Sequence, residues 1–241
     1  MSKLPKEFKF VDLSDYGRPV ARIISQSLKN TRFTPIHLTI GFIISGLLAA
    51  FFLIFKSILD AADGELARIK NTPSYTGRYL DSVADIILNA IFLLTIWYIT
   101  DVNFWWTVVA FFGIQLQGTL YNYYYVILRN RYNGDTTSRI FENKTPKALP
   151  GESQKNVTIL FRLYKTLYGN FDKIIYWLDH KASNGKTLPN FLMTALSIFG
   201  LGFQLLMIAI LLVAEFKEYI IPYFVITTVL IFGFISIRKA L

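Results

Sequence analysis

The sequence contains no cysteine and only two histidines, His37 and His180, which are far apart along the chain. The missing cysteine excludes disulfides, thiolate metal sites and cysteine nucleophiles, and two distant histidines do not make a zinc cluster. Any metal site must therefore use oxygen ligands. Charged residues are also few, at 17% of the 241 residues, whereas 53% are hydrophobic and 16% aromatic. That balance is typical of a membrane protein.

The formal net charge is +9, from 25 basic and 16 acidic residues. The basic residues fall in the polar segments between apolar runs and form no stripe or recognition motif. We therefore expect membrane lipids rather than nucleic acid as partners, because anionic headgroups attract such segments. Residues 1–33 are expected to form an N-terminal cytoplasmic segment with an interfacial amphipathic helix in 11–30, and residues 34–241 a transmembrane catalytic domain.

Five apolar runs approach the roughly 20 helical residues that cross a membrane. They lie at about 34–55, 79–100, 104–127, 189–214 and 219–237. We therefore predict an all-α, polytopic membrane bundle. Basic residues occur just after residue 65, in the segment 128–188 and at the C-terminus. The positive-inside rule therefore places these parts in the cytoplasm. We expect a bacterial or archaeal inner membrane.

The basic N-terminal segment does not fit this topology. A single span between the basic N-terminal segment and residue 60 would place them on opposite sides of the membrane. Two crossings within 34–59 would have about 13 residues each, too few to span the hydrocarbon. We therefore predict one span there and expect that about 15–20 residues before Asp60 are missing from the sequence.

The long segment 128–188 has internal structure. Apolar residues recur at three- and four-residue steps over 158–178, with basic residues between them, which predicts an amphipathic helix. Such a helix lies in the membrane interface or packs on the cytoplasmic end of the bundle, and the pattern does not choose between the two.

Four aspartates stand at helical spacing where the polar and apolar segments meet. Asp60 and Asp63 are three residues apart and Asp81 and Asp85 four apart, so each pair projects from one helix face. A turn around 71–73 can bring the two faces together. Clustered carboxylates need cations, and oxygen ligands select Mg²⁺ or Mn²⁺. A pair of such ions suits phosphoryl transfer.

Three further residues in this segment fit a nucleotide. Arg68 carries a guanidinium fork that matches phosphate oxygens. Gly64 and Ala67 have little or no side chain, which lets a nucleotide approach the helix backbone.

The whole segment resembles the signature of the CDP-alcohol phosphotransferase family, also called CDP-alcohol phosphatidyltransferases. That signature is Asp, two residues, Asp-Gly, two residues, Ala-Arg, eight residues, Gly, three residues, Asp, three residues, Asp. Every fixed position is present: Asp60, Asp63, Gly64, Ala67, Arg68, Gly77, Asp81 and Asp85. We call residues 60–85 the signature.

The resemblance implies a bundle of six membrane helices, usually a homodimer, with two Mg²⁺ or Mn²⁺ ions. It implies four metal ligands, Asp60, Asp63, Asp81 and Asp85. It also implies that a CDP-linked substrate binds along Asp60, Gly64, Ala67, Arg68, Gly77 and Asp81. Asp85 is then the base that deprotonates an acceptor alcohol, which attacks the β-phosphorus and expels CMP. One departure is Ile36, which stands where the family usually has Asn after Thr-Pro.

Two assignments of the substrates are open. In one, CDP-diacylglycerol reacts with a polar alcohol; in the other, CDP-choline or CDP-ethanolamine reacts with diacylglycerol. Residues 77–82 are more like the first group and lack the Phe-Asp-His run of the second. A phosphorylated acceptor would need basic partners, for which the candidates are Arg129, Arg131, Arg139, Lys144 and Arg162. A divalent-cation transporter is the alternative from another class, and the lack of acidic residues in the other spans disfavours it.

Overall fold

The computed structural model describes residues 12–13, 17–48, 53–132, 142, 144–184 and 188–241. Within these ranges the chain is helical and contains no strand, as predicted. The α-helices are α1 Arg18–Leu28, α2 Pro35–Leu48, α3 Leu53–Ile69, α4 Tyr75–Tyr98, α5 Phe104–Arg131, α6 Gln154–Asp179, α7 Asn190–Leu196, α8 Leu201–Val213, α9 Ile220–Thr228 and α10 Leu230–Ala240. Short 3₁₀ turns cover His180–Asn184, Ser197–Phe199 and Lys217–Tyr219.

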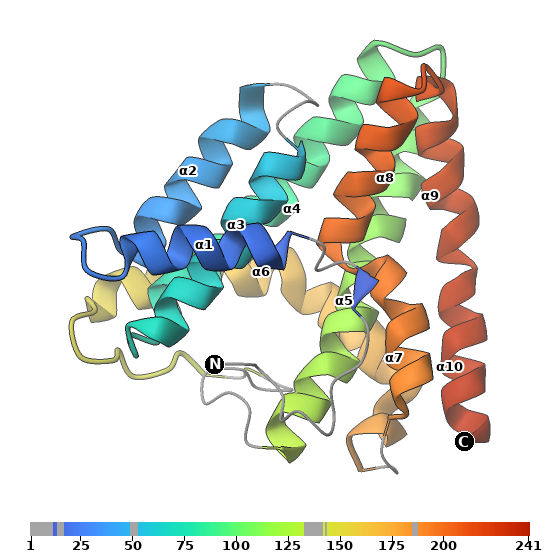
Figure 1. Cartoon of the computed structure of the whole chain (residues 1–241). Coiled ribbons are helices and arrows are strands. Elements are labelled where there is room, and N and C mark those ends of the chain that lie inside the picture. Colours follow the sequence, from blue (N-terminus) through green and yellow to red (C-terminus); the bar gives the residue numbers. More distant parts are fainter. Residues whose placement is uncertain (1–11, 14–16, 49–52, 133–141, 143, 185–187) are drawn as a thin grey trace.

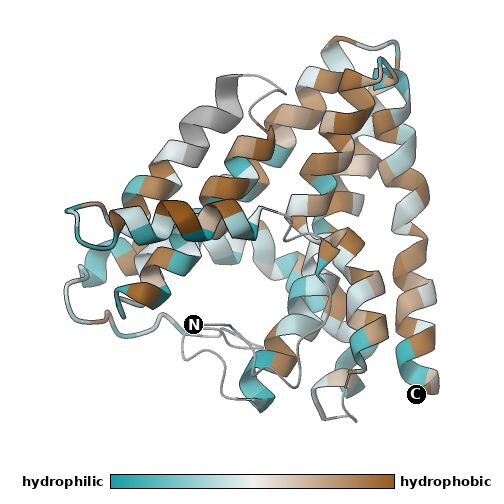
Figure 2. Ribbon diagram, viewed as in Figure 1, coloured by the Kyte–Doolittle hydropathy of each residue, from teal (hydrophilic) through white to brown (hydrophobic). Residues whose placement is uncertain are grey.

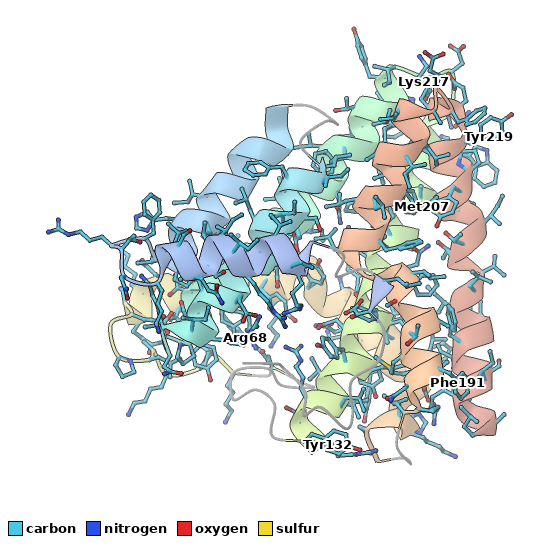
Figure 3. All side chains as sticks on the ribbon, viewed as in Figure 1. Arg68, Tyr132, Phe191, Met207, Lys217 and Tyr219 are labelled. Atoms are coloured by element: carbon cyan, nitrogen blue, oxygen red, sulfur yellow. The ribbon has the colours of Figure 1, made fainter. Side chains whose placement is uncertain are left out.

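Most of the helices run up and down in one bundle, while α1 lies across α3 (Figure 1). Helices α3 and α4 meet at one end, which we call the signature end. Helices α5 and α10 finish towards this end as well. Figure 3 places Arg68 in this half of the molecule and Lys217 and Tyr219 at the opposite end. The signature, the end of α5 and the end of α10 therefore lie towards one side of the bundle, and the placement of this side in the cytoplasm stays a prediction.

The prediction of a single span over about 34–55 is wrong. Helices α2 and α3 are separate, pack against each other and run in opposite directions (Figure 1). This hairpin returns the chain to the side from which α2 starts, so the N-terminal segment and the signature no longer conflict. The expectation of a missing stretch rested on that conflict and loses its basis. Helix α2 has 14 residues, a length of about 21 Å.

Among the described residues, two helices are long and apolar enough to cross a membrane: Tyr75–Tyr98 and the continuous segment Lys217–Ala240. A third span results if Asn190–Phe199 and Leu201–Val213, which meet at a bend of 51°, are counted together. Helix α5 has the length but carries Gln115 and Gln117 in its middle. Figure 2 shows the hydrophobic residues along α8 to α10. The chain is thus a membrane-type bundle, and its number of spans stays a prediction.

Aromatic residues mark the end of the bundle opposite the signature. Several stand exposed at the joins between α4 and α5 and between α8 and α9: Trp97, Tyr98, Phe104, Trp105, Trp106, Phe216 and Tyr219. Tryptophan and tyrosine favour the boundary between lipid and water. Their position indicates where this end of the bundle leaves the hydrocarbon.

Helix α6 confirms the amphipathic helix predicted for 158–178 and extends it at its start. It packs on α4 and α5 and buries Val157, Phe161, Phe171 and Ile175. Its outer side exposes apolar residues such as Trp177, at 77%. The helix therefore packs on the bundle with one face, and its place in the membrane interface stays a prediction.

A buried ion pair fixes the far end of α6. The Arg238 Nε of α10 donates a hydrogen bond of 2.7 Å to Asp179, and the hydroxyl of Tyr124 on α5 donates one of 2.6 Å to the same carboxylate. Asp179 is 1% exposed. Three helices that are distant in sequence are thus joined at one buried acid.

Helix α1 braces the signature helix from outside. The Ser25 hydroxyl donates a hydrogen bond of 2.9 Å to the carbonyl of Ala62 in α3. Gly17 lies so close that an added Cβ would stand 3.0 Å from Ile58. Val20 and Ile23 remain exposed on its outer side, which suits an interfacial helix. The part of the predicted N-terminal segment before residue 12 lies outside the described residues.

Candidate metal and substrate site

The turn between α3 and α4 is built from local hydrogen bonds. Asn71 adopts a left-handed backbone with φ of 51°, and Thr72 N–H donates to the Ala67 carbonyl at 3.0 Å. Ser74 then caps α4, because its hydroxyl accepts a hydrogen bond of 2.8 Å from Gly77 N–H. A Cβ on Gly77 would stand 3.3 Å from that hydroxyl oxygen. The signature glycine therefore permits a close cap at the start of α4.

This turn brings three of the four predicted aspartates together. One carboxylate oxygen from each of Asp60, Asp81 and Asp85 lies within 4.8 Å of the others. The Oδ1 atom of Asp81 is buried and has no hydrogen-bond partner among the described residues. A buried carboxylate oxygen without a donor is costly unless a cation binds it. The donor set and this atom fit a hard divalent ion such as Mg²⁺ or Mn²⁺.

Asp63 lies apart from this group of three. It accepts a hydrogen bond from the hydroxyl of Thr39, a buried residue of α2. Helix α2 thereby holds the second signature aspartate in place. Its predicted role as a metal ligand stays a prediction.

A lysine that the sequence analysis did not single out joins the cluster. Lys56 stands one helical turn before Asp60 on α3 and is fully buried. Its ammonium forms an ion pair with Asp85 Oδ1. The lysine ends an apolar run in the sequence, and only the ion pair between α3 and α4 in the structure reveals its partner.

The guanidinium of Arg68 lies over Gly64. An added Cβ on Gly64 would be 3.5 Å from Arg68 Nη1, and Arg68 Nη2 donates a hydrogen bond of 2.8 Å to Glu65. Arg18 of α1 also pairs with Glu65, at 3.5 Å. Arg68 Nε is buried and has no partner in the described part of the chain. Gly64 thus leaves room for the Arg68 guanidinium, which keeps one donor without a partner among the described residues.

Glu142, from the segment between α5 and α6, contacts the start of α4. Its carboxylate pairs with Arg78 and accepts a hydrogen bond from the Tyr79 hydroxyl. The Arg78 guanidinium also lies 4.6 Å from the centre of the Tyr79 ring. This acid therefore holds two residues that stand between Gly77 and Asp81.

Glu152 caps the same helix from outside. Its Oε1 accepts hydrogen bonds from Thr76 N–H at 2.7 Å and from the Ser74 hydroxyl at 2.8 Å, and its Oε2 accepts one from Leu149 N–H at 3.1 Å. Burial alone would raise the pKa of Glu152, but these hydrogen bonds outweigh it and lower the pKa below its usual value. The carboxylate also complements the positive end of the α4 dipole.

Helix α6 brings tyrosines towards the acidic cluster. The ring of Tyr168 stacks on Tyr164 at 5.6 Å. Burial, and then the charges of Asp85 and Asp81, raise the pKa of the Tyr168 hydroxyl well above its usual value. Tyr164 donates a hydrogen bond of 3.0 Å to Asp172. Burial raises the pKa of Asp172 to about 6. No sequence motif marks these residues, because they lie on a helix far from the signature.

The basic residues proposed to bind a phosphorylated acceptor differ in their surroundings. Arg129 is buried on α5, lies 5.0 Å from the Tyr125 ring centre and bonds Asn122 at 3.4 Å. Lys144 and Arg162 are exposed. Arg139 lies outside the described residues. The structure therefore gives no support to an acceptor site made from this set.

The fold and the site together define a membrane-type helical bundle with a cluster of three aspartates at one end. Residues 29–180, more than half of the chain, match the family model of the CDP-alcohol phosphatidyltransferases. The chain belongs to this family, as its signature indicates, and is a transferase of phosphate-containing groups in phospholipid biosynthesis. Its substrates are a CDP-alcohol and an acceptor alcohol. No curated protein and no solved structure matched the chain.

Proposed function

We propose that the protein transfers a phosphatidyl group from CDP-diacylglycerol to a polar alcohol and releases CMP. The observation that carries this proposal is the convergence of Asp60, Asp81 and Asp85 within 4.8 Å, with a buried oxygen of Asp81 that has no partner in the described part of the chain. By analogy with the family signature, we assign Asp63 as a fourth ligand, although its carboxylate is outside the group of three. A bound Mg²⁺ or Mn²⁺ would neutralise the charge of the diphosphate.

The chain's own residues have the following roles. Arg68, whose guanidinium lies over Gly64 and whose Nε has no partner among the described residues, binds a diphosphate oxygen. Asp60, Ala67, Gly77 and Asp81 contact the CDP moiety, as in the family signature. Asp85 takes the proton of the acceptor hydroxyl, whose oxygen then forms a bond to the β-phosphorus. The bond from that phosphorus to the oxygen of CMP breaks, and CMP leaves.

The choice of CDP-diacylglycerol follows the sequence at the start of α4. Residues 77–82 lack the Phe-Asp-His run that is familiar in transferases of CDP-choline and CDP-ethanolamine. In the alternative assignment, in which diacylglycerol is the acceptor, Asp85 is again the base. We place the signature end in the cytoplasm, because basic residues gather in the segments at that end, and we expect a homodimer by analogy with the family.

The test is release of CMP by the purified chain in detergent or vesicles. Radiolabelled CDP-diacylglycerol, CDP-choline and CDP-ethanolamine are each offered with a panel of acceptors and with Mg²⁺, Mn²⁺ or EDTA. We expect CMP release with CDP-diacylglycerol, dependent on the ion and reduced about 10²–10⁴-fold in Asp85→Asn. The matched control is Asp172→Asn, which changes a carboxylate outside the cluster.

Three outcomes separate the alternatives. CMP release only from CDP-choline or CDP-ethanolamine with diacylglycerol would show that diacylglycerol is the acceptor and not part of the donor. Release that persists in EDTA would contradict the metal requirement. An absence of CMP release with every donor, together with ion flux in vesicles, would instead support the cation transporter.

A further inference from the structure

Lys56 places a positive charge inside the acidic cluster. It lies on α3 one turn before Asp60, is 0% exposed and pairs with Asp85 across the contact between α3 and α4. The ammonium also interacts electrostatically with Asp60 and Asp81. It is therefore a cation of the site itself, supplied by the chain.

The surroundings keep the ammonium in the cluster. Lys56 belongs to a stretch of α3 in which Leu53 and Leu59 are also buried. Movement of the charged group away from the carboxylates would leave it in apolar surroundings, at a cost of several kcal/mol. The lysine side chain therefore stays paired when a metal ion binds beside it.

The balance of charge then limits the number of metal ions. The four signature aspartates carry four negative charges, and Lys56 offsets one. A single divalent ion leaves one negative charge, whereas a second ion leaves a net positive charge before any substrate is present. Glu65 pairs with Arg68 at 2.8 Å and with Arg18 at 3.5 Å. These three residues are not part of the aspartate group, so the balance counts only the aspartates and Lys56. Without Lys56, two divalent ions would match the four carboxylates.

We propose that Lys56 takes the place of one metal ion, so that the enzyme without nucleotide holds a single divalent ion. One oxygen of Asp85 is then reserved for Lys56. Asp60, Asp81 and Asp63 are the principal ligands of the resident ion. Lys56 is thus a positioning residue for the base. This inference rests on the proposed function only for the presence of a metal, and it departs from the two-ion site that the family resemblance implies.

The experiment counts ions on the purified full-length chain without nucleotide. Binding of Mn²⁺ is followed by electron paramagnetic resonance and by titration calorimetry for the natural protein and for Lys56→Met, Lys56→Gln and Lys173→Met. We expect one Mn²⁺ per chain in the natural protein. We expect two in both Lys56 variants, with the spectrum of a coupled ion pair. Lys173 is exposed on α6, so the control should bind one ion.

Two Mn²⁺ ions on the natural protein would overturn the proposal, and this result does not require any variant to fold. A single ion with unchanged affinity in both folded Lys56 variants would also overturn it. The outcome is independent of the assay for CMP. One ion without CMP release would leave the inference intact and contradict the proposed reaction. Two ions with CMP release would contradict the inference and support the proposed reaction.

Discussion

The ammonium of the buried Lys56 on α3 and the partly buried carboxylate of Asp85 on α4 form an ion pair that joins the two helices of the signature. Asp85 is the last aspartate of the signature, and Lys56 precedes the first by one helical turn. The pair therefore spans the acidic group and links its two ends. It keeps α3 against α4 when no metal is bound.

The first prediction concerns this pair. Lys56→Met should lower the stability of the metal-free protein by about 3–5 kcal/mol, because it leaves Asp85 buried among other carboxylates. The double variant Lys56→Met/Asp85→Asn should recover a large part of that loss. Thermal unfolding in detergent with EDTA, followed by size-exclusion chromatography, measures both. Equal losses in the single and the double variant would contradict the pairing.

The second prediction concerns Glu142. Glu142→Gln removes the charge that pairs with Arg78 and weakens the hydrogen bond from Tyr79. Because the Arg78 guanidinium is largely buried, we expect Tm to fall by roughly 5–10 °C. The KM for the CDP substrate should rise several-fold, since Arg78 and Tyr79 stand between Gly77 and Asp81. Glu218→Gln, at an exposed position, is the control and should change neither quantity.

The third prediction is a pH dependence. The pKa of Glu152 is lower in the folded than in the unfolded protein, so the unfolded chain binds the proton more readily. The stabilising contribution is therefore complete above the unfolded pKa, about 4.3, and is lost as the pH falls through the folded pKa. Glu152→Gln should cost about 1 kcal/mol at pH 7, as for the loss of a helix cap. The difference in Tm from the natural protein should shrink below pH 4; a constant difference would contradict this account.

The fourth prediction compares two neighbouring tyrosines of α6. No hydrogen bond is found for the Tyr168 hydroxyl within the described part of the chain, whereas the Tyr164 hydroxyl bonds Asp172. We expect Tyr168→Phe to leave Tm unchanged and to lower kcat/KM about 3–10-fold, the value of one lost hydrogen bond to substrate. Tyr164→Phe should lower Tm instead. Unchanged kinetics in Tyr168→Phe would exclude a role of this hydroxyl at the site.

The sequence predicted those parts of the molecule that follow from local spacing. Intervals of three and four residues place Asp60 and Asp63, and Asp81 and Asp85, on helix faces, and three of these carboxylates do meet. The apolar period over 158–178 likewise predicted α6. Both succeed because the spacing within a helix is fixed by its geometry.

The parts that could not be predicted depend on contacts between distant segments. Lys56, Glu142, Glu152 and Tyr168 act through partners on other helices or loops, so no local pattern marks them. The hairpin of α2 and α3 was missed for another reason. The length rule for spans treats each helix as crossing alone, whereas α2 packs along α3 and on α4 and is short at 14 residues.

The spacing of Lys56 and Asp60 on α3, and of Asp81 and Asp85 on α4, also sets a rule for how this chain can change in length. One residue added between Lys56 and Asp60 would turn the lysine by about 100° around the helix axis, since an α-helix has 3.6 residues per turn. The ammonium would then point away from α4. Insertions and deletions are therefore tolerable in the connections between helices. Inside α3 and α4 they would rotate the aspartates and Lys56 out of the site, so the number of residues between these positions must stay fixed.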